Sequence, residues 1–378
     1  MKILFVLTYY RPHWTGLTQY AARLAEGLAK KGYLVEVLCS QHEKSLARQE
    51  KIKGVRVFRL PFLFRFLRSV VMPSFPLALW QRIRKNQAIV VYLPFQEVAL
   101  VALVTRVLGK KLFLVHNGDL VLPQKGGWRN RLIEKIYCWL TAFSIALANA
   151  VIIQTKDYAQ SSGLLSCFPQ KWRIILPLYD LPAVSKAEVE NFKKKNQLGG
   201  KVLIGFSGRL VEEKGVDYLL QAIPLVVEKI PEAHFVFAGE CKVKYENFWQ
   251  GIRPLIEKNR ASLTLLGLLK SQKEVFSFYK AIDVLVQPSR TDCFPSSQIE
   301  ALLSGIPSVC TDIPGASWAV SKTQMGVLVE PRNPSALAKG VLEVLKNKRK
   351  YQAQQGKVKK IFDNRKILAE YEELFKKG

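Results

Sequence analysis

Short apolar runs of strand length alternate with segments of helical spacing through the first half of the chain. The first run, residues 3–7, precedes apolar positions at Tyr20, Leu24 and Leu28, after which Gly32 marks a stop. Further runs of this kind lie at 35–38, 55–58, 89–93, 112–115 and 151–153. Strands that alternate with helices predict a doubly wound parallel sheet, which binds its ligand at the carboxyl ends of its strands.

A second series of the same kind follows a polar interruption. Residues 179–200 are rich in Lys, Glu, Asn and Gly, and we interpret them as a linker that contains some helix. The later strands are predicted at 202–206, 235–238, 263–266, 284–287, 308–311 and 327–329. The chain therefore divides into domains at 1–178 and 179–378, and a polar helical tail, 350–378, is expected to pack outside the second core. Pro224 should kink or end the helix that begins near Val216.

Length and cysteine usage agree with two ordinary domains in a reducing compartment. A chain of 378 residues exceeds the usual limit for one core. The six cysteines have neither zinc-ligand spacing nor a disulfide pattern, so we expect no bound metal and a cytoplasmic location.

Neither of two apolar segments in the first domain is predicted to span a membrane. Residues 1–10 are predicted to be a strand and not a signal peptide. Residues 136–155 carry no charge and are long enough to cross a bilayer, but polar residues interrupt them, namely Thr141, Ser144, Asn149 and Gln154. They are predicted to be a helix followed by a buried strand.

The net charge of +27 is concentrated in the first half of the chain. Residues 1–175 contain 26 Lys/Arg and 8 Asp/Glu. Within them, residues 62–72 interleave large apolar side chains with Arg65 and Arg68, and Arg82 and Arg84 follow. This pattern fits a peripheral element on the inner, anionic face of the cell membrane, and it fits equally a core-packing segment with solvated arginines. A nucleic-acid partner is not expected, since no nucleic-acid-binding motif accompanies the charge.

Two polar segments about eighty residues apart carry the candidate chemistry. Gly208, Arg209 and Lys214 lie where a predicted strand turns into a helix, a place where backbone amides and cations can bind a diphosphate. Asp292 and Glu300 stand eight residues apart after another strand. Such carboxylates suit sugar hydroxyls, so the two segments together can hold a nucleotide sugar.

These segments resemble the retaining glycosyltransferases of family 4, which have the GT-B fold. The matches occur in the family's order: Gly208-Arg209 with Lys214-Gly215, Ala281-Ile282-Asp283 with Pro288-Ser289, Asp292 to Glu300, Gly305-Ile306-Pro307 and Pro314-Gly315. The resemblance covers almost the whole chain. It implies two Rossmann-like domains with an interdomain cleft, the second binding the nucleotide sugar and the first the acceptor.

The resemblance also assigns roles in the second domain. Arg209 and Lys214 match the residues that bind the donor diphosphate and stabilise its developing charge. Glu300 matches the acid that holds the ribose, and Asp292 matches the acid that contacts the transferred sugar, with one methylene fewer. Gly208, Cys293 and Phe294 also belong to the donor-binding set, as does Gly16 of the first domain. Pro295 replaces a common glycine, and with Asp292 and Cys293 it makes the sugar pocket the least predictable part. Gly239-Glu240-Cys241 departs from the family's Gly-x-Gly, which affects the expected nucleotide and acceptor contacts.

In the first domain the resemblance implies four further residues. Pro12 to Gly16 corresponds to the family's Gly-Gly loop, of which only Gly16 remains, and Thr15 is expected near the acceptor. His116 ends a predicted strand at the position where the family often has a catalytic histidine that bonds the sugar. Asp119 is expected to orient His116 or to bind the acceptor.

The sequence thus predicts a glycosyltransferase that needs no cofactor or metal and acts on a sugar or lipid-linked acceptor, such as a polysaccharide precursor at the membrane. A nucleotide-sugar epimerase or a phosphorylase of the same fold stays open, because fold does not decide between them. A non-catalytic protein that binds nucleotide sugars is the alternative outside enzymes. The donor base, the sugar and the acceptor linkage are not determined by the sequence.

Overall fold

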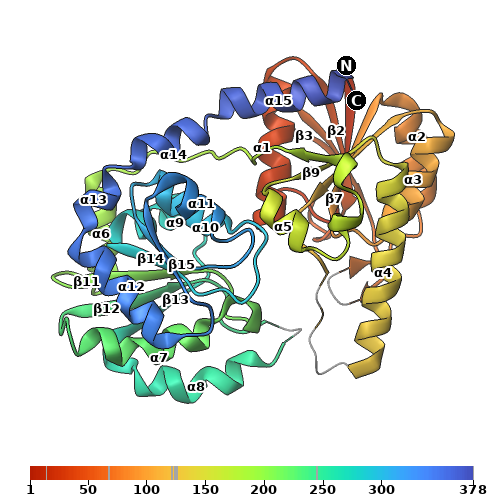
Figure 1. The fold of residues 1–378 in the computed structure, drawn as a ribbon. Coiled ribbons are helices and arrows are strands. Elements are labelled where there is room, and N and C mark those ends of the chain that lie inside the picture. Colours follow the sequence, from red (N-terminus) through yellow and green to blue (C-terminus); the bar gives the residue numbers. More distant parts are fainter. Residues whose placement is uncertain (14, 67–68, 121, 123–126, 244–245, 378) are drawn as a thin grey trace. The chain divides into compact units, whose positions relative to one another are not determined.

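The computed structural model divides the chain into two compact units (Figure 1). Unit 1 comprises Met1–Tyr179 with Asp363–Gly378, and unit 2 comprises Asp180–Phe362. The structure describes residues 1–378 apart from 14, 67–68, 121, 123–126, 244–245 and 378. Each unit is built around one mainly parallel sheet with helices packed on it, as the alternating pattern predicts.

Unit 1 contains an eight-stranded sheet in the order β10-β9-β8-β7-β1-β2-β4-β3. Only β3 runs antiparallel to its neighbour. The strands are β1 (Lys2–Val6), β2 (Leu34–Ser40), β3 (Gln49–Ile52), β4 (Val55–Leu60), β7 (Ala88–Leu93), β8 (Lys111–His116), β9 (Ala150–Ile153) and β10 (Trp172–Ile174), beside a hairpin of β5 (Arg65–Phe66) and β6 (Ser69–Val70). The helices are α1 (Gly16–Lys30), α2 (Phe75–Lys85), α3 (Val98–Val107), α4 (Gly127–Leu147), α5 (Lys156–Ser161) and α15 (Asn364–Lys377).

Unit 2 contains a six-stranded parallel sheet in the order β13-β12-β11-β14-β15-β16. Its strands are β11 (Val202–Ser207), β12 (Ala233–Ala238), β13 (Leu263–Gly267), β14 (Val284–Gln287), β15 (Ser308–Thr311) and β16 (Gly326–Val329). Its helices are α6 (Lys186–Lys195), α7 (Val216–Val227), α8 (Phe248–Lys258), α9 (Gln272–Ala281), α10 (Ser296–Leu303), α11 (Trp318–Thr323), α12 (Pro334–Lys346), α13 (Lys348–Gln352) and α14 (Gln355–Ile361).

Both faces of the second sheet are covered, which explains why its strands read as continuous apolar runs. Ile204 and Phe206 of β11 point into a core that α7 and α12 complete. Leu203, on the opposite face of the same strand, packs into a second core with residues of α6 and α9. Successive apolar side chains of this strand therefore point alternately into the two cores.

The sequence predicted all the central strands of both sheets but missed β3, β5, β6 and β10. These elements are short, polar or at an edge, so their residues carry little of the apolar signal that marks a buried strand. The predicted linker does contain a helix, α6, whose start is a capping box between Ser185 and Glu188.

One expectation about the chain's end is wrong in part. Residues 350–378 are expected on the second core, and those up to Phe362, including α14, do belong to unit 2, whereas α15 belongs to unit 1. Phe375 is fully buried there, with its ring tilted against that of Phe113 of β8 at a centroid distance of 5.0 Å, and Tyr371 is buried beside it. The apolar stripe of this helix is clear in the sequence, but a stripe does not say which core it covers.

Two local expectations can also be compared with the structure. Pro224 does not end α7, which continues to Val227. Within the described part of the chain, no helix is long and apolar enough to cross a bilayer, and the uncharged segment divides into the end of α4 and β9. All six cysteines are free.

Candidate active site

The loops that carry the candidate donor residues follow β11 and β14, which are neighbours in the second sheet. Because both strands are parallel, their carboxyl ends meet at one edge. After β11, the Gly208 amide donates to the Ala238 carbonyl at 2.9 Å, and the Leu210 amide donates to the Glu240 carbonyl at 3.0 Å. A Cβ on Gly239 would lie 1.9 Å from the Gly208 carbonyl oxygen, so only glycine permits this approach between the two loops.

The same edge is closed on its other side by Gly215, which caps α7 with a φ of 62°. A Cβ there would lie 2.0 Å from the Pro288 carbonyl oxygen. The Arg290 amide donates to the Glu213 carbonyl at 2.8 Å, and its guanidinium bonds Asp217 at 2.7 Å. The loop after β11 is therefore fixed to the loop after β14 by backbone as well as side-chain bonds.

Lys214 and Asp292 form an ion pair across these two loops. Both side chains are mostly buried, with relative exposures of 18% and 10%. Burial alone would lower the pKa of Lys214, but the carboxylate of Asp292, with a smaller contribution from Glu213, raises it above its ordinary value. Lys214 is therefore a cation with a fixed position. An anion that binds to Lys214 must compete with Asp292 or share the ammonium with it.

Arg209 lies beside this pair and is more exposed. Its guanidinium contacts Glu213 at 3.3 Å, and its side chain has a relative exposure of 39%. The ion pair is therefore a surface one and contributes little to stability. The guanidinium can turn towards a ligand at small cost, unlike the ammonium of Lys214.

Glu300 of α10 is connected to the end of β11 through Tyr279, a residue that the sequence did not identify as part of the site. The Tyr279 hydroxyl lies 3.2 Å from both the Glu300 carboxylate and the Ser207 hydroxyl, the last residue of β11. Tyr279 lies on α9 among buried aromatic residues, so its sequence position is typical of a core residue. No local signal in the sequence distinguishes it.

Cys293 and Phe294 occupy the segment between the two acids. Burial raises the pKa of the Cys293 thiol well above its ordinary value, so it stays protonated and unreactive. Phe294 is buried against Trp318 and Phe362, with ring centroids 5.8 and 6.4 Å away. Its side chain is thus part of the core, and only the backbone of this residue is available to a donor.

In unit 1, the structure brings His116 and Asp119 together at the end of β8. The His116 side chain is 3% exposed, and its Nδ1 accepts from the Gly118 amide at 3.3 Å. That bond leaves the proton on Nε2, which lies 3.2 Å from the Asp119 carboxylate. Both ring nitrogens therefore have partners, and the ring is held in one orientation.

Tyr158 of α5 and Ser162, which follows this helix, position Asp119, and the sequence missed both. The Asp119 carboxylate accepts from the Ser162 hydroxyl at 3.0 Å and the Tyr158 hydroxyl at 3.3 Å. Partial burial would raise the pKa of Asp119, but the bonds from His116, Ser162 and Tyr158 lower it below its ordinary value. Tyr158 and Ser162 are some forty residues further along the chain, so only the fold pairs them with Asp119.

Thr15 and Gly16 mark the start of α1. Thr15 is the N-cap, and its hydroxyl accepts from the Thr18 amide at 3.3 Å. Gly16 is the first helical residue, and both are exposed. The threonine hydroxyl thus has a local structural role, while the first amides of α1 point out of the helix end. Residue 14 of this loop lies outside the described residues.

The segment 62–72 and the arginines that follow it, predicted to be either a membrane element or a core-packing segment, contain both buried and exposed apolar side chains. Val70 and Met72 are buried in the core, whereas Leu63 and Phe64 are exposed. Arg82 does not point into solvent, because its guanidinium stacks 3.6 Å from the centre of the Phe58 ring. Residue 68 and the side chain of residue 65 lie outside what the structure describes.

Comparison with known proteins identifies the family to which the chain belongs. Residues 188–360 match the family model described as glycosyl transferases group 1, and residues 15–176 match the model described as a glycosyl transferase 4-like domain. Between them the two models span both units. The protein belongs to the group 1 glycosyl transferases, family 4, and is a nucleotide-sugar-dependent glycosyltransferase with the GT-B fold.

Three similar proteins illustrate the range of this family. An uncharacterized glycosyltransferase of Methanocaldococcus jannaschii is 23% identical over 91% of this chain and 89% of its own. The UDP-Gal:alpha-D-GlcNAc-diphosphoundecaprenol alpha-1,3-galactosyltransferase of Escherichia coli is 22% identical over 92% of this chain and 89% of its own. The structure of Anabaena HepE in complex with UDP and glucose superposes with a TM-score of 0.78 at 16% identity and covers 100% of both chains, a likeness of fold.

Proposed function

We propose that this protein transfers a sugar, with retention of its anomeric configuration, from a nucleoside diphosphate sugar to a lipid-linked polysaccharide precursor. Unit 2 would bind the donor and unit 1 the acceptor. The observation that carries the proposal is the buried ion pair of Lys214 and Asp292, held between two loops whose backbones are fixed to each other.

Lys214 and Arg209 would bind the diphosphate. A buried ammonium with a raised pKa keeps its charge over the whole physiological range, so it can stabilise the negative charge that develops as the glycosidic bond breaks. Arg209 is exposed enough to close over the phosphates with its planar guanidinium. Lys214 would be held in place by Asp292, while Arg209, which pairs with Glu213, is the more exposed of the two cations.

The acids would bind the two sugars of the donor. Asp292 would exchange its bond to Lys214 for hydroxyls of the transferred sugar as the diphosphate takes the ammonium. Glu300 would hold the ribose, positioned by the Tyr279 hydroxyl. Gly208 would let the nucleotide approach the backbone, with Cys293 and Phe294 contributing backbone groups alone. None of these steps needs a nucleophilic side chain, so we assign no covalent intermediate.

In unit 1, His116 and Asp119 would bind at the reacting sugar and the acceptor, with Thr15 and Gly16 at the end of α1 nearby in the same unit. Asp119 is held ionised and orients the His116 ring. The acceptor class is supported by the similar Escherichia coli enzyme, whose name specifies a diphosphoundecaprenol substrate. We propose a cytoplasmic protein that associates with the inner face of the membrane.

Hydrolysis of the donor by the pure protein tests the donor site without knowledge of the acceptor. With a panel of nucleotide sugars, including UDP-sugars, release of free nucleoside diphosphate should fall at least about a hundredfold for Lys214→Met or Glu300→Gln, because each removes a charge that the reaction uses. Lys339→Met, an exposed change on unit 2, is the matched control. Release that is unaffected by both changes would refute the site. An isomeric nucleotide sugar as the product would indicate an epimerase.

A further inference from the structure

Helix α4 of unit 1 carries an exposed apolar stripe. Five large side chains, with relative exposures of 40% to 71%, lie along it: Trp128, Leu132, Ile136, Trp139 and Phe143. At about 100° per residue, these positions fall within an arc of roughly 80°. The buried residues of the helix, Thr141, Ser144 and Ile145, lie on the opposite side. The stripe is thus turned away from the side of the helix that packs on the protein.

The neighbouring helix also exposes apolar side chains. Helix α3 packs beside α4 (Figure 1). It exposes Leu103 and Val107, with relative exposures of 50% and 65%. In the described part of unit 2, by contrast, the exposed large apolar side chains are Leu225 and Leu268, well separated in sequence. Exposed apolar side chains that are concentrated on two neighbouring helices mark an interaction site. We call these seven residues the α3–α4 face.

Cations border the α3–α4 face. Arg129, Arg131 and Lys135 are exposed on α4, flanking the stripe. The one acid of this helix, Glu134, accepts a bond from the Leu122 amide at 2.5 Å, so it is turned to its own loop. Arg129 also lies over the Trp128 ring, 5.7 Å from its centre.

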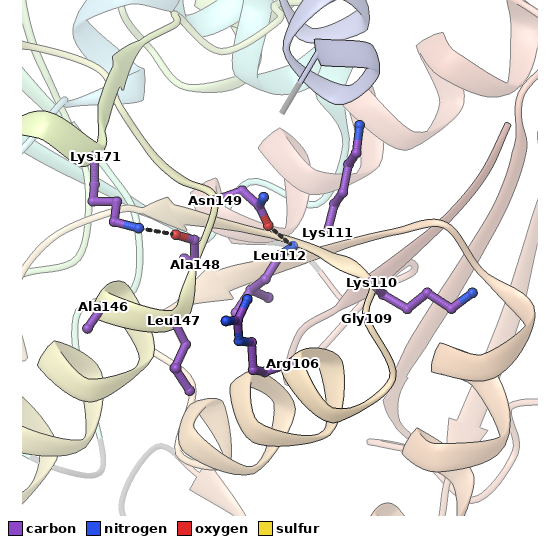
Figure 2. Close-up of a pocket in the computed structure, with 10 residues that line it drawn as sticks. All are labelled: Arg106, Gly109, Lys110, Lys111, Leu112, Ala146, Leu147, Ala148, Asn149 and Lys171. Carbon is purple, nitrogen blue, oxygen red and sulfur yellow. Dashed lines mark hydrogen bonds between the residues drawn. The ribbon is translucent and has the colours of Figure 1, made fainter.

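A basic cavity lies where α3 and α4 end. It has a volume of about 640 Å³, and Figure 2 shows the Arg106 guanidinium and the Lys171 ammonium within it, while Lys110 points outward from its rim. Lys171 donates to the Ala148 carbonyl at 2.7 Å. None of the ten lining residues is acidic. Such a cavity suits a phosphate group.

We propose that the α3–α4 face binds an anionic membrane, with the apolar stripe in the headgroup boundary and the bordering cations on lipid phosphates. Tryptophans at two places along the stripe suit this boundary, because an indole has an apolar body and a polar N–H. A second copy of the chain fits less well. A twofold contact would bring Arg129, Arg131 and Lys135 against their own counterparts on a chain of net charge +27.

The position of the face in unit 1 fits a lipid-linked acceptor, and in this respect the inference rests on the proposed function. Helix α4 begins eight residues after Asp119, the candidate acceptor residue. The bond between the Leu122 amide and Glu134 ties Leu122 to the helix. A lipid held at the stripe would present its head group to the same segment that carries the candidate residues.

Sedimentation of the full chain with vesicles tests the face directly. Wild type should bind vesicles of equal phosphatidylcholine and phosphatidylglycerol and should bind pure phosphatidylcholine much less. The triple change Leu132→Gln, Ile136→Gln and Trp139→Gln should lower binding at least about tenfold, as should the triple change Arg129→Glu, Arg131→Glu and Lys135→Glu. The matched controls on unit 2, Leu225→Gln with Leu268→Gln and Lys322→Glu with Lys339→Glu, should bind like wild type.

Donor hydrolysis separates this inference from the proposed function. The α4 variants should hydrolyse donor like wild type, since they leave the candidate site residues of both units unchanged. Because His116 lies in the same unit as α4, retained hydrolysis would show that a loss of vesicle binding is not due to misfolding of unit 1. Three results would overturn the inference: wild type that does not bind anionic vesicles, α4 variants that bind as well as wild type, or a wild-type dimer in solution that the apolar variant dissociates. Absent donor hydrolysis in wild type would instead count against the proposed function alone.

Discussion

At the scale of single residues, the candidate donor site depends on two glycines as much as on its charged groups. Gly215 and Gly239 allow the loop after β11 to touch its neighbours on both sides, at the carbonyls of Pro288 and Gly208. Lys214 immediately precedes Gly215, so its backbone position depends on that contact. The glycines set the backbone, and the ion pair with Asp292 then sets the side chain.

Gly239→Ala should destabilise unit 2 by about 3 kcal/mol, because the new methyl group would lie 1.9 Å from the Gly208 carbonyl oxygen at a φ of 147°. Hydrogen exchange of the β11 and β12 amides measures this change. Gly251→Ala is the control. It lies in α8 with open space around its Cβ position, so it should be neutral or stabilising by up to about 1 kcal/mol. Equal effects of the two changes would contradict the close-approach argument.

At the scale of elements, α7 contains a proline without ending there, and its surroundings explain how. Pro224 has no amide hydrogen, so the Leu220 carbonyl four residues earlier loses its helical donor. The side-chain amide of Asn259 supplies one at 3.0 Å. Asn259 follows α8, which packs beside α7. The hydrogen bond that Pro224 removes from α7 is therefore replaced by a bond from the residue that follows α8.

Asn259→Ala should cost about 2 kcal/mol, because it leaves the buried Leu220 carbonyl without a donor. In a Pro224→Ala background the cost should fall by about half, since the restored amide at position 224 can bond Leu220 itself. Asn196→Ala is the control, because Asn196 makes a similar side-chain bond to Phe192 at the end of α6, where no proline is present. A double-mutant cycle on unfolding free energies should show coupling for Asn259 and none for Asn196; additive effects at both sites would exclude the repair.

At the scale of the whole molecule, the charge imbalance and the α3–α4 face belong to the same unit. Residues 1–175 carry 26 Lys/Arg against 8 Asp/Glu, and the exposed large apolar side chains are concentrated in unit 1. A membrane contact with both components has an electrostatic part that salt weakens and an apolar part that it does not.

Vesicle binding by the full chain should therefore decrease with salt but not disappear. Between about 0.01 M and 1 M salt the Debye length falls from roughly 30 Å to 3 Å, so the electrostatic part should be lost over this range. The variant that lacks Leu132, Ile136 and Trp139 should lose all binding at high salt, and wild type should keep a residual fraction. The matched change at Leu225 and Leu268 should behave as wild type. Identical salt curves for all three proteins would exclude an apolar contribution from the stripe.

The series of central strands and the two α/β units could be read from the sequence alone, because each buried strand is marked by its own apolar residues. The sequence also placed Arg209 and Lys214 between a strand and a helix, since these elements follow one another locally along the chain. Only the tertiary structure decided where the amphipathic helices pack: α15 covers the first sheet and not the second.

The structure also decided which polar groups meet. Tyr279 reaches Glu300 and Ser207, Tyr158 and Ser162 reach Asp119, and α4 turns its apolar stripe outward. Each of these depends on residues far apart in sequence or on which side of a helix is covered. Local periodicity contains no information about either, because the free energy that selects the partner comes from packing between elements and not from the element alone.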